Sequence, residues 1–210
     1  MSITRCRKCP RLVAWREQIA LEKRAAFRDW DYWGRPVPGF GDPSAKVYVL
    51  GLAPAAHGGN RTGRVFTGDR SGDWLFASLH RTGFANQPTS VAKDDGLELK
   101  GAFVAAAVRC APPANKPLPS ERDNCLPYAA AELELLQPRV IVCLGAFAWD
   151  AAFRLLQLKP KAKFGHGAEH QANGLTLIAS FHPSQQNTFT GRLTEPMMDA
   201  VFLRAREVAG

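Results

Sequence analysis

Four of the five cysteines are placed where they can hold a metal group. Cys6 and Cys9 form a C-x2-C pair near the N-terminus, and Cys110 and Cys125 form a wider pair in the middle of the chain. Four thiolates bind either a zinc ion or an iron–sulfur cluster, and this spacing favours neither; the alternative is a set of unrelated buried thiols. The odd number of cysteines argues against a disulfide framework. Cys143, inside the apolar run VIVCLG, is expected to be a small buried hydrophobic residue.

Three polar residues in separate loops are candidates for catalysis. His182 stands before a proline at the end of an apolar run and opens a polar loop. Asp69 follows an aromatic-glycine turn, where an acidic residue either caps a helix or faces a pocket. Asn115 lies in the proline-flanked segment RCAPPANKP, where its amide either binds its own backbone or contacts a ligand. The remaining histidines lack such a position, and the last two are expected in an exposed loop: His57, His80, His166 and His170.

The segment 51–69 is rich in glycine, which lets a backbone approach a ligand closely. It contains no lysine, so it lacks the G-K-[ST] ending of a phosphate-binding P-loop. The G-x-G-x-x-G pattern of dinucleotide-binding folds is also absent. These two absences argue against a nucleotide cofactor.

Apolar runs that alternate with helical periodicity predict an α/β fold. Strands are expected at residues 47–54, 102–108, 140–145 and 175–181. Helices are expected at residues 10–27, after a Ser71 cap, after a Ser120 cap with Pro127 as a bend or true first turn, at 146–158 and at 193–209. This alternation predicts a parallel sheet with helices on both faces. Ligands bind beyond the carboxyl ends of such strands, which is where the polar loops fall.

The composition limits the classes of partner. The chain has 27 Lys and Arg against 19 Asp and Glu, a net charge of +8, which favours a polyanion such as nucleic acid; the alternative is a solvated basic surface. No apolar stretch reaches the length of a membrane span, and the N-terminus lacks the apolar core of a secretion signal. We therefore expect a cytoplasmic protein without a membrane partner.

Together, these motifs resemble the uracil-DNA glycosylase superfamily, and most closely its iron–sulfur branch, family five or UDGb. GLAPAAHGGNRTGR resembles the first active-site motif of that family and HPSQQNTFTGR resembles the second. The four paired cysteines match its [4Fe–4S] ligand pattern, and RPVPGFGDP and RCAPPANKP also resemble family segments. One difference separates this branch from the others, which carry a polar Asp, Asn or Glu where Leu52-Ala53-Pro54-Ala55 is apolar.

The resemblance implies one α/β domain over residues 1–210 with a central four-stranded parallel sheet. It implies hydrolysis of the N-glycosidic bond of uracil in DNA, which leaves an abasic site for base excision repair. It also implies activity on other deaminated bases, such as hypoxanthine and xanthine. A structural [4Fe–4S] cluster on Cys6, Cys9, Cys110 and Cys125 is implied as well, and we expect a monomer.

On this basis, each candidate residue receives an expected role. Asp69 holds or activates the attacking water, His182 donates to a uracil carbonyl, and Asn115 contacts the base, the water or both. Phe66 stacks on the extruded base, and the backbone of Gly51, Leu52 and Ala53 lines its edge. Phosphate contacts are expected from Arg61, Arg64 and Arg192, and Lys116 is a further candidate. The tip at Asn187–Phe189, or Thr190, is expected to enter the minor groove.

Two other classes of protein compete with a glycosylase. One is a non-catalytic nucleic-acid-binding module stabilised by zinc or an iron–sulfur cluster, and the other is an iron–sulfur electron carrier. Visible absorption from a cluster would exclude zinc. Alkali-labile cleavage of a uracil-containing oligonucleotide would favour the enzyme.

Overall fold

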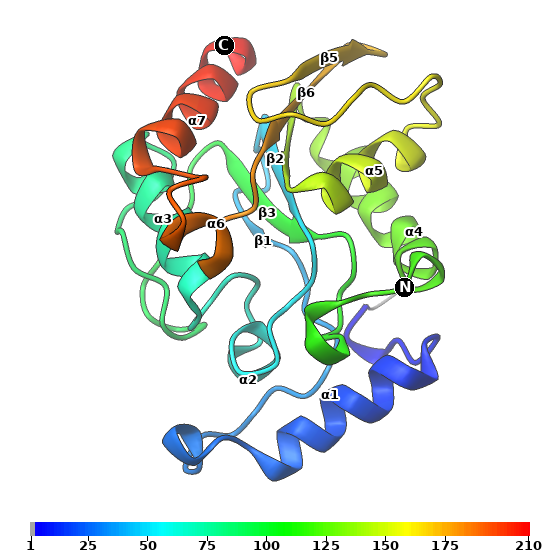
Figure 1. Ribbon diagram of the computed structural model, residues 1–210, viewed down its shortest axis with the longest axis vertical. Helices are drawn as coiled ribbons and strands as arrows, with labels where there is room; N and C mark the ends of the chain where they lie inside the picture. The colour runs from blue at the N-terminus through cyan, green and yellow to red at the C-terminus, as the bar shows by residue number, and fades with distance from the viewer. Residues whose placement is uncertain (1–2) are drawn as a thin grey trace.

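The chain folds around one six-stranded sheet with the order β1-β3-β2-β4-β6-β5 (Figure 1). The computed structural model describes residues 3–210. The strands are β1 (Phe40–Gly41), β2 (Val47–Gly51), β3 (Ala102–Ala106), β4 (Val140–Leu144), β5 (Glu169–Ala172) and β6 (Leu175–Ser180). The four inner strands are parallel and are the four that the sequence predicts. The α/β class with a central parallel sheet is therefore confirmed.

Two short antiparallel strands, which the sequence analysis missed, extend the sheet at its edges. β1 pairs with β3, and β5 pairs with β6. The segment EHQA of β5 is polar and alternates between exposed and half-buried, so it has no apolar run that would indicate a strand. The expectation of an exposed loop for His170 is wrong because its ring lies in β5, 4.8 Å from the ring of Phe153. His166 is half-buried, and its Nδ1 accepts a hydrogen bond from the backbone N–H of Phe181 at 3.1 Å.

Helices cover both faces of the sheet. The longer ones are α1 (Pro10–Glu22), α3 (Arg70–Arg81), α4 (Pro119–Leu136), α5 (Ala146–Leu155) and α7 (Glu195–Ala209). The short ones are η1 (Ile3–Arg5), η2 (Ala25–Phe27), α2 (Gly59–Thr62), η3 (Pro113–Asn115) and α6 (Gln185–Phe189). In Figure 1, α3 and α7 lie on one side of the sheet and α4 and α5 on the other. Val47 and Val49 of β2 pack on the side of α3 and α7, and Tyr48 and Leu50 pack on the side of α4 and α5, because successive side chains of a strand point to opposite faces.

The helix starts differ from the predicted caps by a few residues. Asp69, not Ser71, caps α3, and its Oδ1 accepts the backbone N–H of Gly72 at 3.0 Å. α4 begins at Pro119, so neither Ser120 as cap nor Pro127 as first turn is correct. A proline at the first position needs no hydrogen-bond partner for its nitrogen, which explains this start. α1 ends at Glu22, earlier than expected, because the backbone of Lys23 leaves the helical region, with φ of 54° and ψ of 169°.

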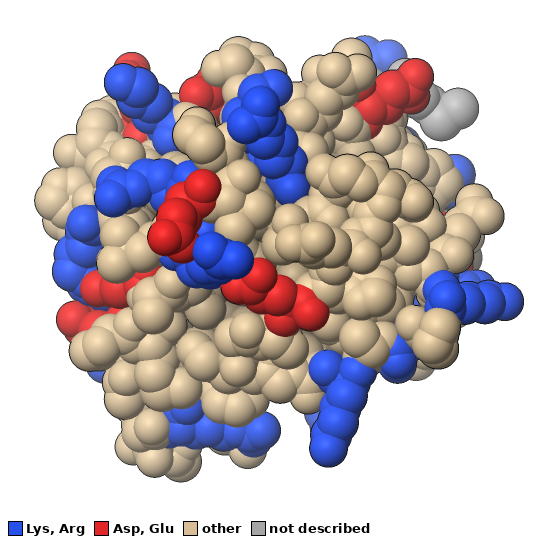
Figure 2. Space-filling model, turned by 90° about the horizontal axis from the view of Figure 1, so that it is seen from above, with Lys and Arg blue, Asp and Glu red and all other residues tan. Residues whose placement is uncertain are grey.

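The outer surface carries charges of both signs. Figure 2 shows Lys and Arg side chains intermixed with Asp and Glu on the face that lies at the top of Figure 1. The net charge of +8 is therefore not gathered into one basic surface on this face. Within residues 3–210, no helix is both long enough and apolar enough to cross a membrane.

Candidate active site

A cleft of about 730 Å³ lies at the carboxyl ends of the inner strands. Asp69, Asn115 and His182 all contribute to its wall, although they come from three distant parts of the sequence. Leu52 and Ala53 line it as well, directly after β2. The fold thus brings the three candidate catalytic residues to one place; their individual roles stay predictions.

Asp69 both caps a helix and faces the cleft, so the two alternatives for this residue are compatible. Its Oδ1 accepts the N–H of Gly72, and its Oδ2 packs against the Cα of Gly58 so closely that a Cβ there would overlap with it. Burial raises the pKa of the Asp69 carboxyl above its usual value; backbone hydrogen bonds from Gly72 and Ser71 oppose the rise. These contacts at both carboxylate oxygens fix the Asp69 side chain in one position in the cleft wall.

Phe66 forms an aromatic surface inside the cleft. Its ring covers Gly51, where an added Cβ would come within 2.5 Å of two ring atoms. Phe66 is a non-glycine residue with φ of 52°, a strained conformation that surrounding contacts must hold in place. Gly51 does not line the base edge as expected, because the ring covers it and its carbonyl accepts the N–H of Ala107. The ring of Phe66 lies 6.1 Å from that of His182.

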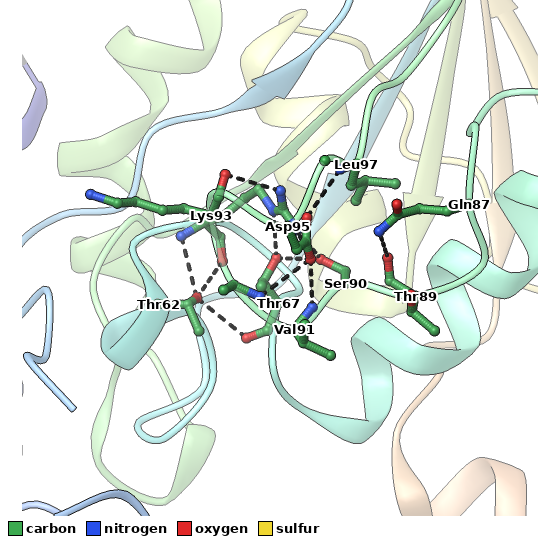
Figure 3. Close-up of polar contacts among 12 residues, drawn as sticks. Thr62, Thr67, Gln87, Thr89, Ser90, Val91, Lys93, Asp95 and Leu97 are labelled. Carbon is green, nitrogen blue, oxygen red and sulfur yellow. Dashed lines mark hydrogen bonds and ion pairs between the residues drawn. The ribbon is translucent and has the colours of Figure 1, made fainter. Parts of the chain in front are cut away.

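A buried polar network holds the loop that carries Phe66. Thr67, Ser90 and Asp95 converge there (Figure 3), with the Thr67 and Ser90 hydroxyls 2.7 Å apart. Arg64 joins them: its guanidinium binds Asp95 at 2.7 Å, donates to Ser90 and Thr67, and is 4% exposed. A guanidinium buried and paired in this way is not available to DNA. The expected phosphate contact of Arg64 is therefore wrong, and the residue supports the Phe66 loop instead.

Arg61 is also buried, at 4% exposed. It donates to the carbonyls of His57 and Gly68 at 2.7 and 3.1 Å, and its guanidinium lies 3.9 Å from the ring of Phe27 and 4.1 Å from that of Trp30. We correct its expected role as a phosphate contact, because the guanidinium is buried, donates to two backbone carbonyls and lies against two aromatic rings. Arg61 joins the segment before Asp69 to residues 27–30.

His182 opens the loop after β6 and is neutral at physiological pH. Burial lowers the pKa of His182 to about 4. Its carbonyl accepts the side-chain amide of Asn187 at 2.8 Å, so Asn187 orients this loop rather than standing at its tip. The exposed tip is Phe189, at 67% exposed, with Thr190 beside it. An imidazole without charge is suited to donating one hydrogen bond to an oxygen that gains negative charge.

Three predicted residues are exposed, and one of them, Asn115, lines the cleft. Asn115 is exposed at the end of η3, where both it and Ala114 have left-handed φ values of 55° and 52°. This unusual backbone places Asn115 in the cleft wall. Arg192 is exposed with its guanidinium 4.5 Å from the ring of Phe181, and it stays a candidate for a phosphate contact. Lys116, next to Asn115, is exposed too.

The four paired cysteines line one cavity between α1, the loop after β3 and α4: Cys6, Cys9, Cys110 and Cys125. The Cys110 sulfur accepts a hydrogen bond from Arg16 Nη1 at 2.9 Å, and the Cys9 sulfur accepts one from Asn124 at 3.4 Å. Within residues 3–210, no three His, Cys, Asp or Glu side chains converge on a position that would hold one metal ion. The sulfurs thus share a cavity without the close tetrahedral arrangement of a zinc site. Cys143 is fully buried in β4, as expected.

The sequence analysis missed several residues that line the cleft. Arg24, Phe27 and His57 line it, as do Ser184, Gln185 and Gln186 after His182. Arg24 and Phe27 lie just beyond α1, where nothing in the sequence indicates a cleft. The sequence analysis set His57 aside although it lies within the first motif, and that position was the available indication.

Comparison with known proteins agrees with this arrangement. A family model described as "Uracil DNA glycosylase superfamily" matches residues 38–206. Proteins named type-5 uracil-DNA glycosylase are 54% identical in Mycobacterium bovis, over 99% of this chain and 80% of that protein, and 51% identical in Thermus thermophilus, over 100% and 96%. A type-4 uracil-DNA glycosylase of Archaeoglobus fulgidus is 30% identical over 70% of each chain. The chain therefore belongs to the uracil-DNA glycosylase superfamily, in its type-5 branch.

Proposed function

We propose that this protein is a DNA glycosylase that hydrolyses the N-glycosidic bond of uracil in DNA and leaves an abasic site. The observation that carries the proposal is the shared cleft, in which Asp69 and the neutral His182 stand with the ring of Phe66. The names of the relatives support the same reaction. The protein would act on DNA as a cytoplasmic monomer with one domain over residues 1–210.

Breaking the glycosidic bond leaves positive charge on the sugar and negative charge on the departing base. Asp69 offsets the sugar charge and holds the attacking water, while His182 donates to a uracil oxygen as its charge grows. Phe66 stacks on the base after the base leaves the duplex. Because both groups are positioned before the substrate arrives, little reorganisation is needed in the transition state.

A wider range of bases follows from the apolar first motif. Leu52 and Ala53 line the cleft with hydrophobic side chains. A wall without polar side chains leaves no unpaired hydrogen-bonding group when a purine binds, so it discriminates weakly between bases. Hypoxanthine and xanthine are therefore proposed as further substrates.

A structural [4Fe–4S] cluster is proposed on Cys6, Cys9, Cys110 and Cys125. The buried guanidinium of Arg16 supports it: Nη1 donates to the Cys110 sulfur, and Nε has no hydrogen-bond partner in the described part of the chain. Besides Glu17 at 3.7 Å, this buried cation contacts the Cys110 sulfur, and a positive charge there favours a thiolate. When bound, the cluster cross-links the N-terminal segment to α4 and to the loop after β3.

Single-turnover excision of uracil from an oligonucleotide, read as alkali-labile cleavage, tests the function. We expect His182→Ala to lower the rate by about 10²–10³-fold, as for the loss of one donor to a developing oxyanion. Asp69→Asn should also be strongly impaired. A near-wild-type rate for Asp69→Asn would refute the assignment of the water. DNA binding without excision by the unaltered protein would favour the non-catalytic module.

A further inference from the structure

The proposed mechanism leaves one wall of the cleft without a role. Arg24 and Phe27 come from the segment around η2, and His57 comes from the loop after β2. Arg24 is exposed, and its guanidinium has no hydrogen bond or ion pair with any residue that the structure describes. A free cation therefore stands beside an imidazole at the cleft.

Two contacts hold this wall to the first motif. The Tyr32 hydroxyl lies 3.0 Å from Nδ1 of His57, and their rings meet edge-on with centroids 6.1 Å apart. The guanidinium of Arg61 packs on the rings of Phe27 and Trp30 while it binds the carbonyl of His57. Tyr32 thus contacts the side chain of His57 and Arg61 contacts its backbone, and these contacts fix the position of the wall relative to Asp69.

The hydrogen bonds around Tyr32 relate the proton of its hydroxyl to the tautomer of His57. The backbone N–H of Arg24 donates to the Tyr32 hydroxyl at 3.3 Å, and Nδ1 of His57 is the one acceptor the hydroxyl meets among residues 3–210. When the hydroxyl donates its proton to Nδ1, the imidazole carries its own proton on Nε2. Burial, together with the charges of Arg24 and Arg61, holds the pKa of His57 below its usual value. In this tautomer, His57 offers an N–H donor from Nε2.

A hydrogen-bond donor beside an unpaired cation favours an anion as ligand. His57 precedes Gly58, whose Cα packs against the carboxylate of Asp69. The anion must therefore lie close to the group that faces the sugar. In DNA, the anion next to the sugar is the backbone phosphate.

We propose that Arg24 and His57 bind a phosphate of the DNA strand adjacent to the extruded nucleotide, with Tyr32 positioning His57. This inference rests on the proposed function and names the part of the substrate that the wall recognises. The contact draws the strand toward Asp69 at the place where the nucleotide leaves the duplex.

The test uses strands in which one phosphate next to the uridine is replaced by a neutral methylphosphonate, on its 5′ side or its 3′ side. On the unmodified strand, Arg24→Ala and His57→Ala should each weaken binding about ten- to a hundredfold, the equivalent of one charge-assisted hydrogen bond. On the strand neutralised at the contacted linkage, that loss should disappear. Arg28→Ala is the matched control, since Arg28 is exposed on the same segment but does not line the cleft.

Tyr32→Phe separates positioning from packing. It keeps the ring and its edge contact with His57 but removes the hydroxyl. We expect it to raise KM more than it lowers kcat, to show part of the His57→Ala loss, and to add nothing in a His57→Ala background. An equal loss in both backgrounds would show that Tyr32 acts through packing alone.

The outcomes separate this inference from the function on which it rests. A penalty for His57→Ala that is the same on every methylphosphonate strand would refute the phosphate contact. A penalty that changes between uracil and hypoxanthine but not with the linkage would place His57 on the base and would also refute it. Absence of excision by the unaltered protein on the unmodified strand would refute the function, while the binding measurements would still decide the contact.

Discussion

Replacing Gly58 by alanine tests whether the position of the Asp69 carboxylate controls the reaction. The added Cβ would overlap with Oδ2 of Asp69 and come within 2.9 Å of its Cβ and Cγ. Ordinary van der Waals contact begins near 3.4 Å, so Cβ and Cγ must move by roughly 0.5 Å and Oδ2 by roughly 1.2 Å. A misplacement of this size lowers the rate of a positioned reaction by about 10²-fold. If the movement also breaks the cap on Gly72, the free energy of unfolding should fall by about 1 kcal/mol.

The assay is single-turnover excision of uracil, with denaturant unfolding measured on the same samples. Gly165→Ala is the control, because an added Cβ at Gly165 meets no atom within 4 Å, and it should leave both quantities unchanged. Adding Gly58→Ala to Asp69→Asn should cause little further loss, since both changes act through one carboxylate. A Gly58→Ala protein with the wild-type rate, or two losses that multiply, would refute this account of Asp69.

Three further predictions concern buried ionisable side chains. The pKa of His182 is lowered to about 4 in the folded protein, whereas the unfolded chain binds a proton there below about pH 6.5. The free energy of unfolding should therefore fall by up to about 3 kcal/mol from pH 6.5 to pH 4. Denaturant unfolding of His182→Gln should show a smaller fall over the same range. Arg64→Met should lower the free energy of unfolding by about 3–5 kcal/mol, because the buried Asp95 carboxylate keeps its backbone hydrogen bonds but loses its countercharge. The salt dependence of DNA binding, which would change if Arg64 touched phosphate, should stay the same. Cys110→Ser and Arg16→Met should lower the iron content and visible absorption of the purified protein, and Cys143→Ala should keep both; iron that stays bound in Cys110→Ser would disprove the cysteine assignment.

The sequence predicts the inner strands well, because a strand that is buried on both faces consists of a continuous apolar run. Residues 140–144 are all buried, and the run VIVCL indicates a strand without any other information. The polar strand β5 lies at an edge and leaves no such pattern. The convergence of Asp69, Asn115 and His182 was also predictable, since loops at the carboxyl ends of parallel strands meet at one edge.

The sequence shows which residues carry a charge but not which of them are buried, and for this reason the phosphate contacts predicted for two arginines were wrong. Arg61 and Arg64 stand in a glycine-rich motif beside candidate site residues, which is where phosphate contacts are expected. The partner of Arg64 is Asp95, in the stretch 84–101 that has no periodicity, so the sequence gives no means of pairing them. His57 was passed over for a similar reason, because the Tyr32 that orients it lies in a different loop.

The N-terminal segment contributes chemistry that the family core alone does not hold. The superfamily match begins at residue 38, and Asp69, Asn115 and His182 all lie within it. Four residues that precede it supply two of the four cysteines in the cavity and part of the cleft wall: Cys6, Cys9, Arg24 and Tyr32.

One residue joins these two contributions. The side chain of Arg16 binds the Cys110 sulfur and the Cys6 carbonyl, while its backbone carbonyl accepts the amide of Asn60 in α2. α2 directly follows Gly58, the residue against which the Asp69 carboxylate packs. The cysteine cavity and the proposed catalytic carboxylate are therefore connected through a few buried contacts. A metal group that anchors the N-terminal segment would thus also keep α2, and with it the Asp69 wall, in register with the sheet.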